Sequence, residues 1–183
     1  MKIGVISDTH GDYASWERAF NYLSDADLIL HAGDVLYHGP RNEIPAGYNP
    51  KKLIGALNDC SIPILISRGN CDASVDQMVL NIPIQSPYVF AVVENKRFLV
   101  QHGDQITESG IQDLISRYKL DYLITGHTHV PVLRKLDNCI IINPGSTSLS
   151  KRDDKINSIG IIEDDDVYII DLETGDKLFE IKK

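Results

Sequence analysis

The feature that most constrains this chain is a short apolar run that stops at a cluster of polar residues. Ile3–Ile6 is typical of a buried strand, and Asp8, His10 and Gly11 follow it within a few positions. A carboxylate and an imidazole two residues apart, just past a strand, can converge on one point and suit a first-row divalent metal. For this pair alone a solvated turn is the better explanation, so further ligands must come from elsewhere in the chain.

The same arrangement returns in the first half of the chain. Asp27–Ala32 predicts a second strand that ends shortly before Asp34, and Ile62–Ile66 predicts a third that leads to Asn70 and Cys71. Apolar residues at helical spacing separate these strands. The first half is therefore predicted to be β-α-β-α-β, with a polar cluster after each strand.

The second half is predicted to be mostly antiparallel. Two runs within residues 88–101 predict a hairpin whose second arm leads into His102. Asp121–Thr125 predicts a strand that is followed by His127 and His129. Further short runs after these residues predict additional strands in a hairpin or meander.

Both halves fit an α/β fold. A layered sandwich of two mixed β-sheets flanked by helices accommodates them in a single domain over residues 1–183, and no repeat or composition break divides the chain. Ligand sites in such folds lie outside the carboxyl ends of strands, which is where the polar clusters fall. The acidic run Asp164–Asp166 is interpreted as a solvated turn.

Composition narrows the function. The net charge of −8 argues against a broad nucleic-acid surface, which needs clustered Lys and Arg, but a small phosphorylated substrate stays possible because metal ions reverse the local field. No apolar stretch approaches the roughly 20 residues of a membrane span, and the short run before Asp8 is no signal peptide. The cysteines Cys60, Cys71 and Cys139 form neither a disulfide framework nor a CxxC pair, so we expect a cytoplasmic protein.

The metal-capable side chains at the predicted strand ends form one set. Their number exceeds the ligands of one tetrahedral zinc site and suits two ions, roughly 3.5–4 Å apart, that share a bridging carboxylate. His127 and His129 cannot easily chelate one ion from a regular strand, whereas in a loop the two rings could serve different ions. The set comprises Asp8, His10, Asp34, Asn70, His102, His127 and His129.

These motifs, in this order, resemble the signature of the calcineurin-like metallophosphoesterases over about the first 150 residues. The signature pieces are Asp8-x-His10, Gly33-Asp34, Gly69-Asn70, His102 and Gly126-His127-x-His129. Longer segments are similar to the small bacterial YfcE-type phosphodiesterases of that family. They are Gly33–Asn42, Arg68–Asp72 and Asn143–Ser146.

The resemblance implies a phosphodiesterase in which a metal-bridging hydroxide attacks phosphorus in line, with no covalent enzyme intermediate. It implies two divalent transition-metal ions, manganese first, with nickel, cobalt, iron or zinc also compatible. One ion would be held by Asp8, His10, Asp34 and His129. The other would be held by the bridging Asp34 with Asn70, His102 and His127. The catalytic residues implied are Asp34, Asn70, Cys71 and His102.

Cys71 departs from the wider family, in which a histidine usually follows the motif asparagine, although cysteine is usual in the YfcE-type group. A thiol with a reference pKa of about 8.5 can donate a proton to a leaving group. Beside two cations it can also ionise and lose that role. Substrates with good leaving groups are therefore favoured over alkyl phosphates.

Two other functions stay open. One is a non-catalytic protein-binding scaffold on the same fold, like the retromer subunit Vps29, and the other is a phosphomonoesterase. A scaffold is expected to have lost the bridging aspartate or the motif asparagine, but Asp34 and Asn70 are both present. The expected partner is a small phosphodiester, with no membrane, and a homo-oligomer is possible. On the loop Leu36–Pro50, His38 and Arg41 fit either substrate contact or a solvated or oligomer-forming loop.

Overall fold

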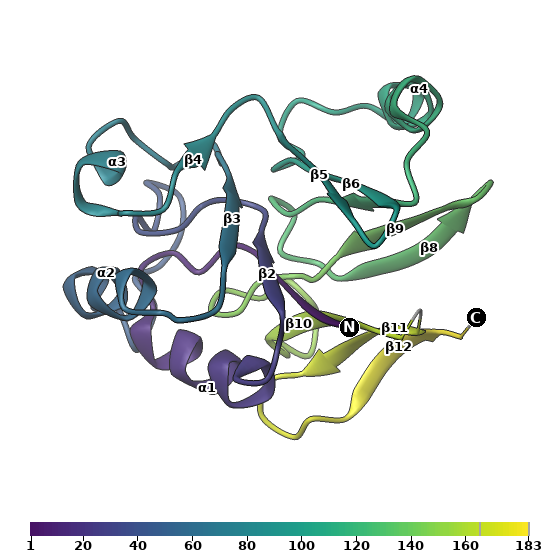
Figure 1. The fold of residues 1–183 in the computed structure, drawn as a ribbon. Helices are drawn as coiled ribbons and strands as arrows, with labels where there is room; N and C mark the ends of the chain where they lie inside the picture. Colours follow the sequence, from purple (N-terminus) through teal and green to yellow (C-terminus); the bar gives the residue numbers. More distant parts are fainter. Residues whose placement is uncertain (165, 183) are drawn as a thin grey trace.

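The computed structural model describes residues 1–164 and 166–182, so Asp165 of the predicted acidic turn lies outside them. Two β-sheets pack face to face, with helices on their outer sides (Figure 1). The first sheet has the order β12-β11-β10-β1-β2-β3-β4, and the second has the order β5-β6-β7-β9-β8. The first comprises β1 (Lys2–Ile6), β2 (Leu28–His31), β3 (Ile64–Ser67), β4 (Ile84–Gln85), β10 (Ser158–Glu163), β11 (Asp166–Asp171) and β12 (Lys177–Ile181). The second comprises β5 (Val89–Val93), β6 (Lys96–Val100), β7 (Tyr122–Ile124), β8 (Val132–Leu136) and β9 (Cys139–Asn143).

The first sheet joins the predicted β-α-β-α-β half to the C-terminal strands. β1, β2 and β3 are parallel neighbours, connected by α1 (Tyr13–Leu23) and α2 (Pro50–Asn58). Asp12 caps α1 and Asn49 caps α2, each by accepting a backbone N–H, and Pro50 begins α2. On its other side β1 pairs antiparallel with β10, so the sheet is mixed, as predicted.

The second sheet is mixed as well. β6, β7 and β9 are parallel, while β5 and β8 pair antiparallel at the two edges. The predicted hairpin of β5 and β6 turns through Glu94 and Asn95, both left-handed, as a tight hairpin requires. The helix α4 (Glu108–Tyr118) packs on this sheet through Ile111 and Ile115.

Three hydrophobic clusters hold these layers together. The central cluster lies between the sheets and joins Val5 and Leu30 of the first to Val100 and Ile124 of the second. The other two pack α1 and α2 on the first sheet and α4 on the second. The predicted fold class, a layered α/β sandwich of two mixed sheets flanked by helices, is confirmed.

Two short elements were not predicted from the sequence. They are α3 (Asp76–Val79) and β4 (Ile84–Gln85). A single helical turn and a two-residue strand are too short to produce a periodic pattern. Within the part of the chain that the structure describes, no helix is long and apolar enough to span a membrane.

Candidate metal centre

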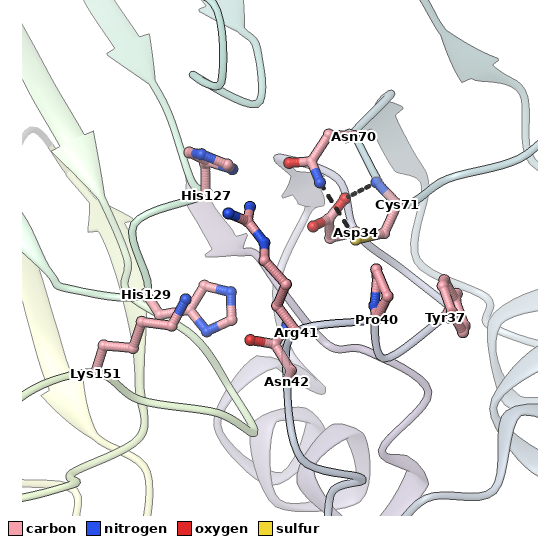
Figure 2. A pocket seen from close by; sticks show the side chains of 11 residues that line it. Asp34, Tyr37, Pro40, Arg41, Asn42, Asn70, Cys71, His127, His129 and Lys151 are labelled. Carbon is pink, nitrogen blue, oxygen red and sulfur yellow. Dashed lines mark hydrogen bonds between the residues drawn. The ribbon is translucent and has the colours of Figure 1, made fainter.

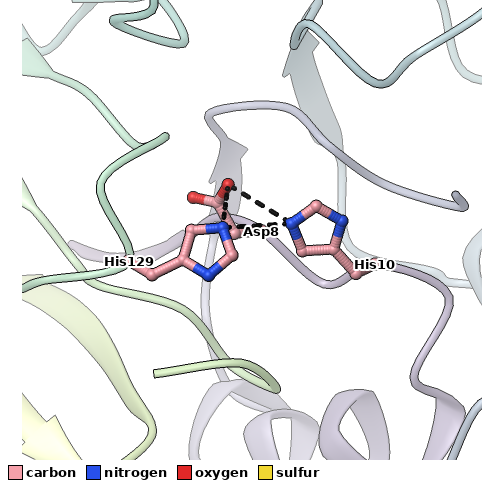
Figure 3. A group of neighbouring side chains, drawn as sticks. All are labelled: Asp8, His10 and His129. Atoms are coloured by element: carbon pink, nitrogen blue, oxygen red, sulfur yellow. Dashed lines mark hydrogen bonds and ion pairs between the residues drawn. The ribbon is translucent and has the colours of Figure 1, made fainter. Parts of the chain in front are cut away.

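Asp8, His10 and His129 form the first group of metal-capable side chains (Figure 3). Oδ1 of Asp8 lies 3.2 Å from Nε2 of His129 and 3.7 Å from Nε2 of His10. The two Nε2 atoms are 3.1 Å apart. All three side chains are buried, and they come from the loops that follow β1 and β7 in different sheets.

The other nitrogen of each imidazole fixes its tautomer. Nδ1–H of His10 donates to the Tyr37 carbonyl at 2.7 Å, and Nδ1–H of His129 donates to the Leu149 carbonyl at 2.6 Å. A neutral ring has only one N–H, so when both rings are neutral, as metal ligands are, the two Nε2 atoms present lone pairs to each other. Lone pairs at this distance repel unless a positive charge lies between them, so the group fits a metal ion.

Asp8 directs a carboxylate oxygen at the two ring nitrogens. Its Oδ2 accepts hydrogen bonds from the Ser7 hydroxyl at 2.6 Å and from the His127 backbone at 3.0 Å. Its Oδ1, which faces the rings, is buried and has no hydrogen-bond partner among the described residues. Burial favours the neutral acid, but the nearby histidines His129 and His102 and the Ser7 hydroxyl outweigh it and lower the pKa of Asp8. A buried carboxylate oxygen without a donor is costly, and a divalent cation would satisfy it.

His102 is the centre of the second group. Its Nε2 lies 3.3 Å from Oδ2 of Asp34, 3.0 Å from Oδ1 of Asn70 and 3.3 Å from Nδ1 of His127. Its Nδ1–H donates to the Ala32 carbonyl at 2.8 Å, which aims Nε2 at the group. Carboxylate, amide and imidazole atoms therefore meet around one nitrogen.

Asp34 lies between the two groups. Its Oδ2 is 3.3 Å from Nε2 of His102 and 3.8 Å from Nε2 of His10. One carboxylate oxygen thus faces a ring nitrogen of each group, which is a position that a bridging ligand can occupy. His127 and His129 also direct their rings to different groups, although only one residue separates them in the chain.

The electrostatics of the site favour a cation. Burial disfavours a charged His102 ring, but the hydrogen bond and charge of Asp34, together with Asp8, outweigh it and raise the pKa of His102 to about 9. Burial likewise opposes ionisation of Asp34, but the hydrogen bond and charge of His102 hold its pKa well below its usual range. Burial lowers the pKa of His10 and of His127, which keeps both rings neutral, so each has a nitrogen lone pair that a metal ion could bind.

Cys71 lies beside the metal-capable atoms. Its Sγ lies within 4.8 Å of ligand atoms of His10 and Asp34, and it accepts a hydrogen bond from Nδ2 of Asn70 at 3.3 Å. Burial and the neighbouring carboxylates raise the pKa of the thiol to about 12, so it keeps its proton at neutral pH. A Cβ on Gly39 would lie 3.0 Å from Sγ, so a side chain at position 39 would crowd the thiol.

The backbone is left-handed at five of the predicted ligands. φ is 53° at Asp8, 47° at His10, 60° at Asp34, 67° at His127 and 57° at His129. This region costs a residue with a side chain roughly 1–2 kcal/mol. Such positions persist only where surrounding contacts determine them, and they cluster at ligand clamps.

Asp72 holds two of the site loops together. Its carboxylate accepts hydrogen bonds from the backbone N–H groups of Asp34, Val35 and Gly69 at 2.9, 2.8 and 2.7 Å. A Cβ on Gly69 would lie 2.2 Å from Oδ1 of Asp34. Only glycine therefore lets the turn after β3 approach the loop after β2 so closely.

The segment after β9 holds the loops that follow β1 and β7. Ser146 donates from Oγ to the Asp8 carbonyl at 2.7 Å and accepts the Leu149 N–H at 2.9 Å. Asn143 donates from Nδ2 to the Gly126 carbonyl at 2.8 Å. The sequence marked this segment only through its family resemblance, because its residue types do not reveal whose backbone they hold.

His31 is a supporting histidine near the site. The Gly33 N–H donates to its Nδ1 at 3.0 Å, so its Nε2–H donates to the Thr9 hydroxyl at 2.8 Å. The ring is completely buried, and burial lowers its pKa to about 4. It therefore joins the loops after β1 and β2 as a neutral ring.

A cavity of about 490 Å³ opens beside these groups (Figure 2). Its lining includes Asp34, Asn70, Cys71, His127 and His129 from the site and Tyr37, Gly39, Pro40, Arg41, Asn42 and Lys151 from the surrounding loops. A second cavity, of about 410 Å³, lies against Asn70 and His102. The sequence had marked Arg41, but nothing in it distinguished Lys151 from a surface lysine.

Comparison with known proteins identifies the family. The calcineurin-like phosphoesterase superfamily domain matches residues 1–166. The chain belongs to this superfamily. It is 37% identical to the phosphodiesterase YfcE of Escherichia coli over 174 residues, which cover 94% of this chain and 92% of that protein. It is also 32% identical over 163 residues to a probable metallophosphoesterase of Methanothermobacter thermautotrophicus, covering 84% and 81% of the two chains.

Solved structures agree with this assignment. The phosphoesterase YfcE from E. coli superposes with a TM-score of 0.87 at 33% identity, over 99% of this chain and 98% of that one. Vps29 from Chaetomium thermophilum superposes with a TM-score of 0.69 at 15% identity, over 99% and 95%, which is a likeness of fold. The predicted resemblance to the superfamily and to its YfcE-type phosphodiesterases is confirmed.

Proposed function

We propose that this superfamily member is a phosphodiesterase that binds two divalent ions and hydrolyses a small phosphodiester. The observation that carries the proposal is the position of Asp34 Oδ2 between ring nitrogens of His10 and His102, each belonging to a separate ligand group. The identity with the phosphodiesterase YfcE supports the choice of a diester. The proposed setting is the cytoplasm.

The donor atoms fit the proposed ions. Imidazole nitrogens, carboxylate oxygens and one amide oxygen suit manganese, iron, cobalt, nickel or zinc, and we place manganese first. When bound, two such ions would activate a water molecule and offset the charge that develops on the phosphoryl oxygens.

The chain's own residues prepare the site for this chemistry. The carbonyls of Tyr37, Leu149 and Ala32 hold the imidazole tautomers, so the inward nitrogens need not reorganise when a substrate arrives. Cys71 lines the cavity beside Asn70, where a protonated thiol would donate its proton to the oxygen of the leaving group.

The test compares esters that share one leaving group. Bis(p-nitrophenyl) phosphate is a diester and p-nitrophenyl phosphate is a monoester, and both release p-nitrophenolate. With Mn²⁺ the chain should hydrolyse the diester with the higher kcat/KM, and a chelator should abolish turnover. Preference for the monoester would establish a phosphomonoesterase. No turnover of either ester with Mn²⁺, Ni²⁺, Co²⁺ or Zn²⁺ would favour a binding scaffold.

The role of Cys71 has a separate test. Cys71→Ala should slow hydrolysis of diphenyl phosphate more than that of bis(p-nitrophenyl) phosphate, because phenolate needs a proton more than p-nitrophenolate does. Cys60→Ala is the matched control, since Cys60 is also half-buried but lies outside the cavity. Equal slowing of both esters would remove Cys71 from proton transfer.

A further inference from the structure

Two cationic side chains line the cavity beside the ligand groups. Figure 2 shows Arg41 extending from the loop after β2 toward the middle of the cavity, and Lys151 entering from the segment after β9. Neither side chain makes an ion pair or a hydrogen bond within residues 1–164 and 166–182. Acidic residues outnumber Lys and Arg by 26 to 18, so partners for these two cations are not scarce in the chain.

Arg41 belongs to a loop that is built into the site. The Tyr37 carbonyl, four positions earlier, accepts the His10 Nδ1–H at 2.7 Å. Nδ2 of Asn42 donates to the His38 carbonyl at 2.8 Å and closes the turn that carries the arginine. The backbone that presents Arg41 is therefore fixed relative to the first ligand group.

Lys151 is fixed to the same group from the opposite side. Its backbone N–H donates to the His129 carbonyl at 3.1 Å. The Leu149 carbonyl, two residues earlier, accepts Nδ1–H of the same histidine at 2.6 Å. The two cations are thus presented by segments that also orient His10 and His129, rather than by independent surface loops.

The charge of the proposed centre leaves these cations without a counter-charge. Two divalent ions beside the carboxylates of Asp8 and Asp34 already offset a phosphodiester, which carries a single negative charge, and its anionic nucleophile. Arg41 and Lys151 are exposed, so water weakens their repulsion with such a centre, but a ligand with more negative charge would attract both of them. A terminal phosphate carries about −1.5 to −2 at neutral pH, which matches two cations.

We infer that Arg41 and Lys151 form a subsite for a second anionic group, so that the substrate is a phosphodiester that also carries a terminal phosphate. A guanidinium offers a planar fork to phosphate oxygens, and an ammonium group offers a point charge. The cavity of about 490 Å³ lies in the usual range of small-molecule sites, about 300–1,000 Å³, and extends beyond the ligand groups. This inference rests on the proposed function and names the substrate class of the same site.

A matched pair of substrates tests the subsite. Thymidine 5′-(p-nitrophenyl phosphate) and its 3′-phosphorylated form have the same scissile bond and differ only in the terminal phosphate. The Mn²⁺-loaded protein should prefer the phosphorylated form. Arg41→Gln and Lys151→Gln should each lower the ratio of the two kcat/KM values about tenfold or more, as loss of a charged hydrogen bond does.

Lys51→Gln is the control for net charge. Lys51 is exposed on α2, lies outside the cavity lining and has no ion pair in the described part of the chain. Its substitution removes the same charge and should leave the ratio unchanged. A comparable fall in the Lys51 variant would mean that the preference comes from the overall field, and the inference would be wrong.

A binding measurement gives a readout besides activity. Calorimetric titration with thymidine 3′,5′-bisphosphate and thymidine 5′-monophosphate should show tighter binding of the bisphosphate, in the metal-free protein as well as the loaded one. The double variant Arg41→Gln/Lys151→Gln should lose that preference, and added salt should weaken it in the wild type.

The outcomes separate the inference from the proposed function. If the variants slow both thymidine diesters equally, the two cations contact the scissile phosphate and the inference is overturned, while the phosphodiesterase stands. If the wild type hydrolyses no diester, the proposed function fails. In that case a bisphosphate preference that the double variant loses still supports the anion subsite, and equal affinities overturn it.

Discussion

Left-handed backbone occurs in two kinds of place in this molecule, and the two differ in what holds it. At the candidate metal centre, Asp8, His10, Asp34 and His129 are buried and His127 is half-buried. Elsewhere the non-glycine residues with positive φ are all exposed, in turns or at the end of a helix. In the described part of the chain these are Glu94, Asn95, Lys119, Asp137, Lys155 and Asp164.

The bonding around the two sets explains the difference. The hairpin residues adopt left-handed backbone because a two-residue turn between twisted strands demands it. At the centre the backbone is held by distant segments, such as the Gly33 carbonyl, which accepts the Asp8 N–H at 3.0 Å, and the Asp34 carbonyl, which accepts the His10 N–H at 3.0 Å. Strain at turns follows from local geometry, whereas strain at the centre is maintained by contacts between distant segments of the chain.

The largest expected effect comes from removing charge at the centre while keeping its backbone. Asparagine tolerates left-handed backbone, so Asp34→Asn should fold normally. It should lower kcat on bis(p-nitrophenyl) phosphate by more than about 100-fold, because loss of a bridging ligand exceeds the 10–100-fold cost of losing a supporting partner. Circular dichroism checks the fold. Turnover near the wild-type value would show that Asp34 is not a ligand.

The next largest effect concerns His31, whose buried ring joins the loops after β1 and β2. His31 has a pKa of about 4 in the folded chain, below about 6.5 in the unfolded chain. The unfolded state therefore binds more protons between these values, and stability falls as pH drops from about 6.5 toward 4, by about 3 kcal/mol in total. Urea unfolding of the metal-free protein should show this loss.

His31→Gln isolates the contribution of that ring. The variant should be less stable than the wild type at neutral pH, and the difference should shrink as the pH falls toward 4. A difference that stays constant over this range would mean that the ring does not titrate as its burial requires.

A smaller effect is expected from removing the Ser146 hydroxyl, which holds the backbone of Asp8. Ser146→Ala removes a hydroxyl that donates to the Asp8 carbonyl and accepts the N–H groups of Ser148 and Leu149, which should cost about 1–3 kcal/mol of unfolding free energy and weaken Mn²⁺ binding. Thr174→Ala is the matched control, because Thr174 accepts one N–H in an exposed turn, and it should cost no more than about 0.5 kcal/mol. Equal costs would remove the distinction between the two regions.

The smallest effect concerns an exposed residue with left-handed backbone, and it is a gain in stability. Lys119 ends α4 with φ 51° and ψ 53°, a position that glycine occupies without steric cost. Lys119→Gly should raise the unfolding free energy by up to about 1 kcal/mol and leave turnover unchanged. Urea titration measures the first and the diester assay the second. Destabilisation would show that the lysine side chain contributes more than the backbone strain costs.

The strands and the polar residues after them could be predicted because both depend on local pattern. The run before Asp8 and the run before Asp34 have the length and composition of buried strands, and parallel strands bring their carboxyl ends to one edge. The positions of the ligand residues along the chain therefore follow from sequence. Their use as metal ligands stays a proposal, which the family resemblance supports.

Other features could not be predicted because they depend on contacts between distant segments. The tautomer of His129 is set by the Leu149 carbonyl, and the support beneath Asp8 comes from Ser146, far along the chain. Lys151 has an ordinary residue type, and only its tie to the His129 carbonyl places it at the cavity. Such roles become visible only when the fold is known.

We propose that the left-handed residues of the candidate metal centre converge on two metal sites that share Asp34. Calorimetric titration of the metal-free protein with Mn²⁺ tests it most directly. The wild type should bind two ions per chain, and Asp34→Asn should weaken both, because one oxygen of Asp34 faces both ligand groups. Binding of a single ion, or an Asp34→Asn protein that binds two ions as tightly as the wild type, would contradict this account.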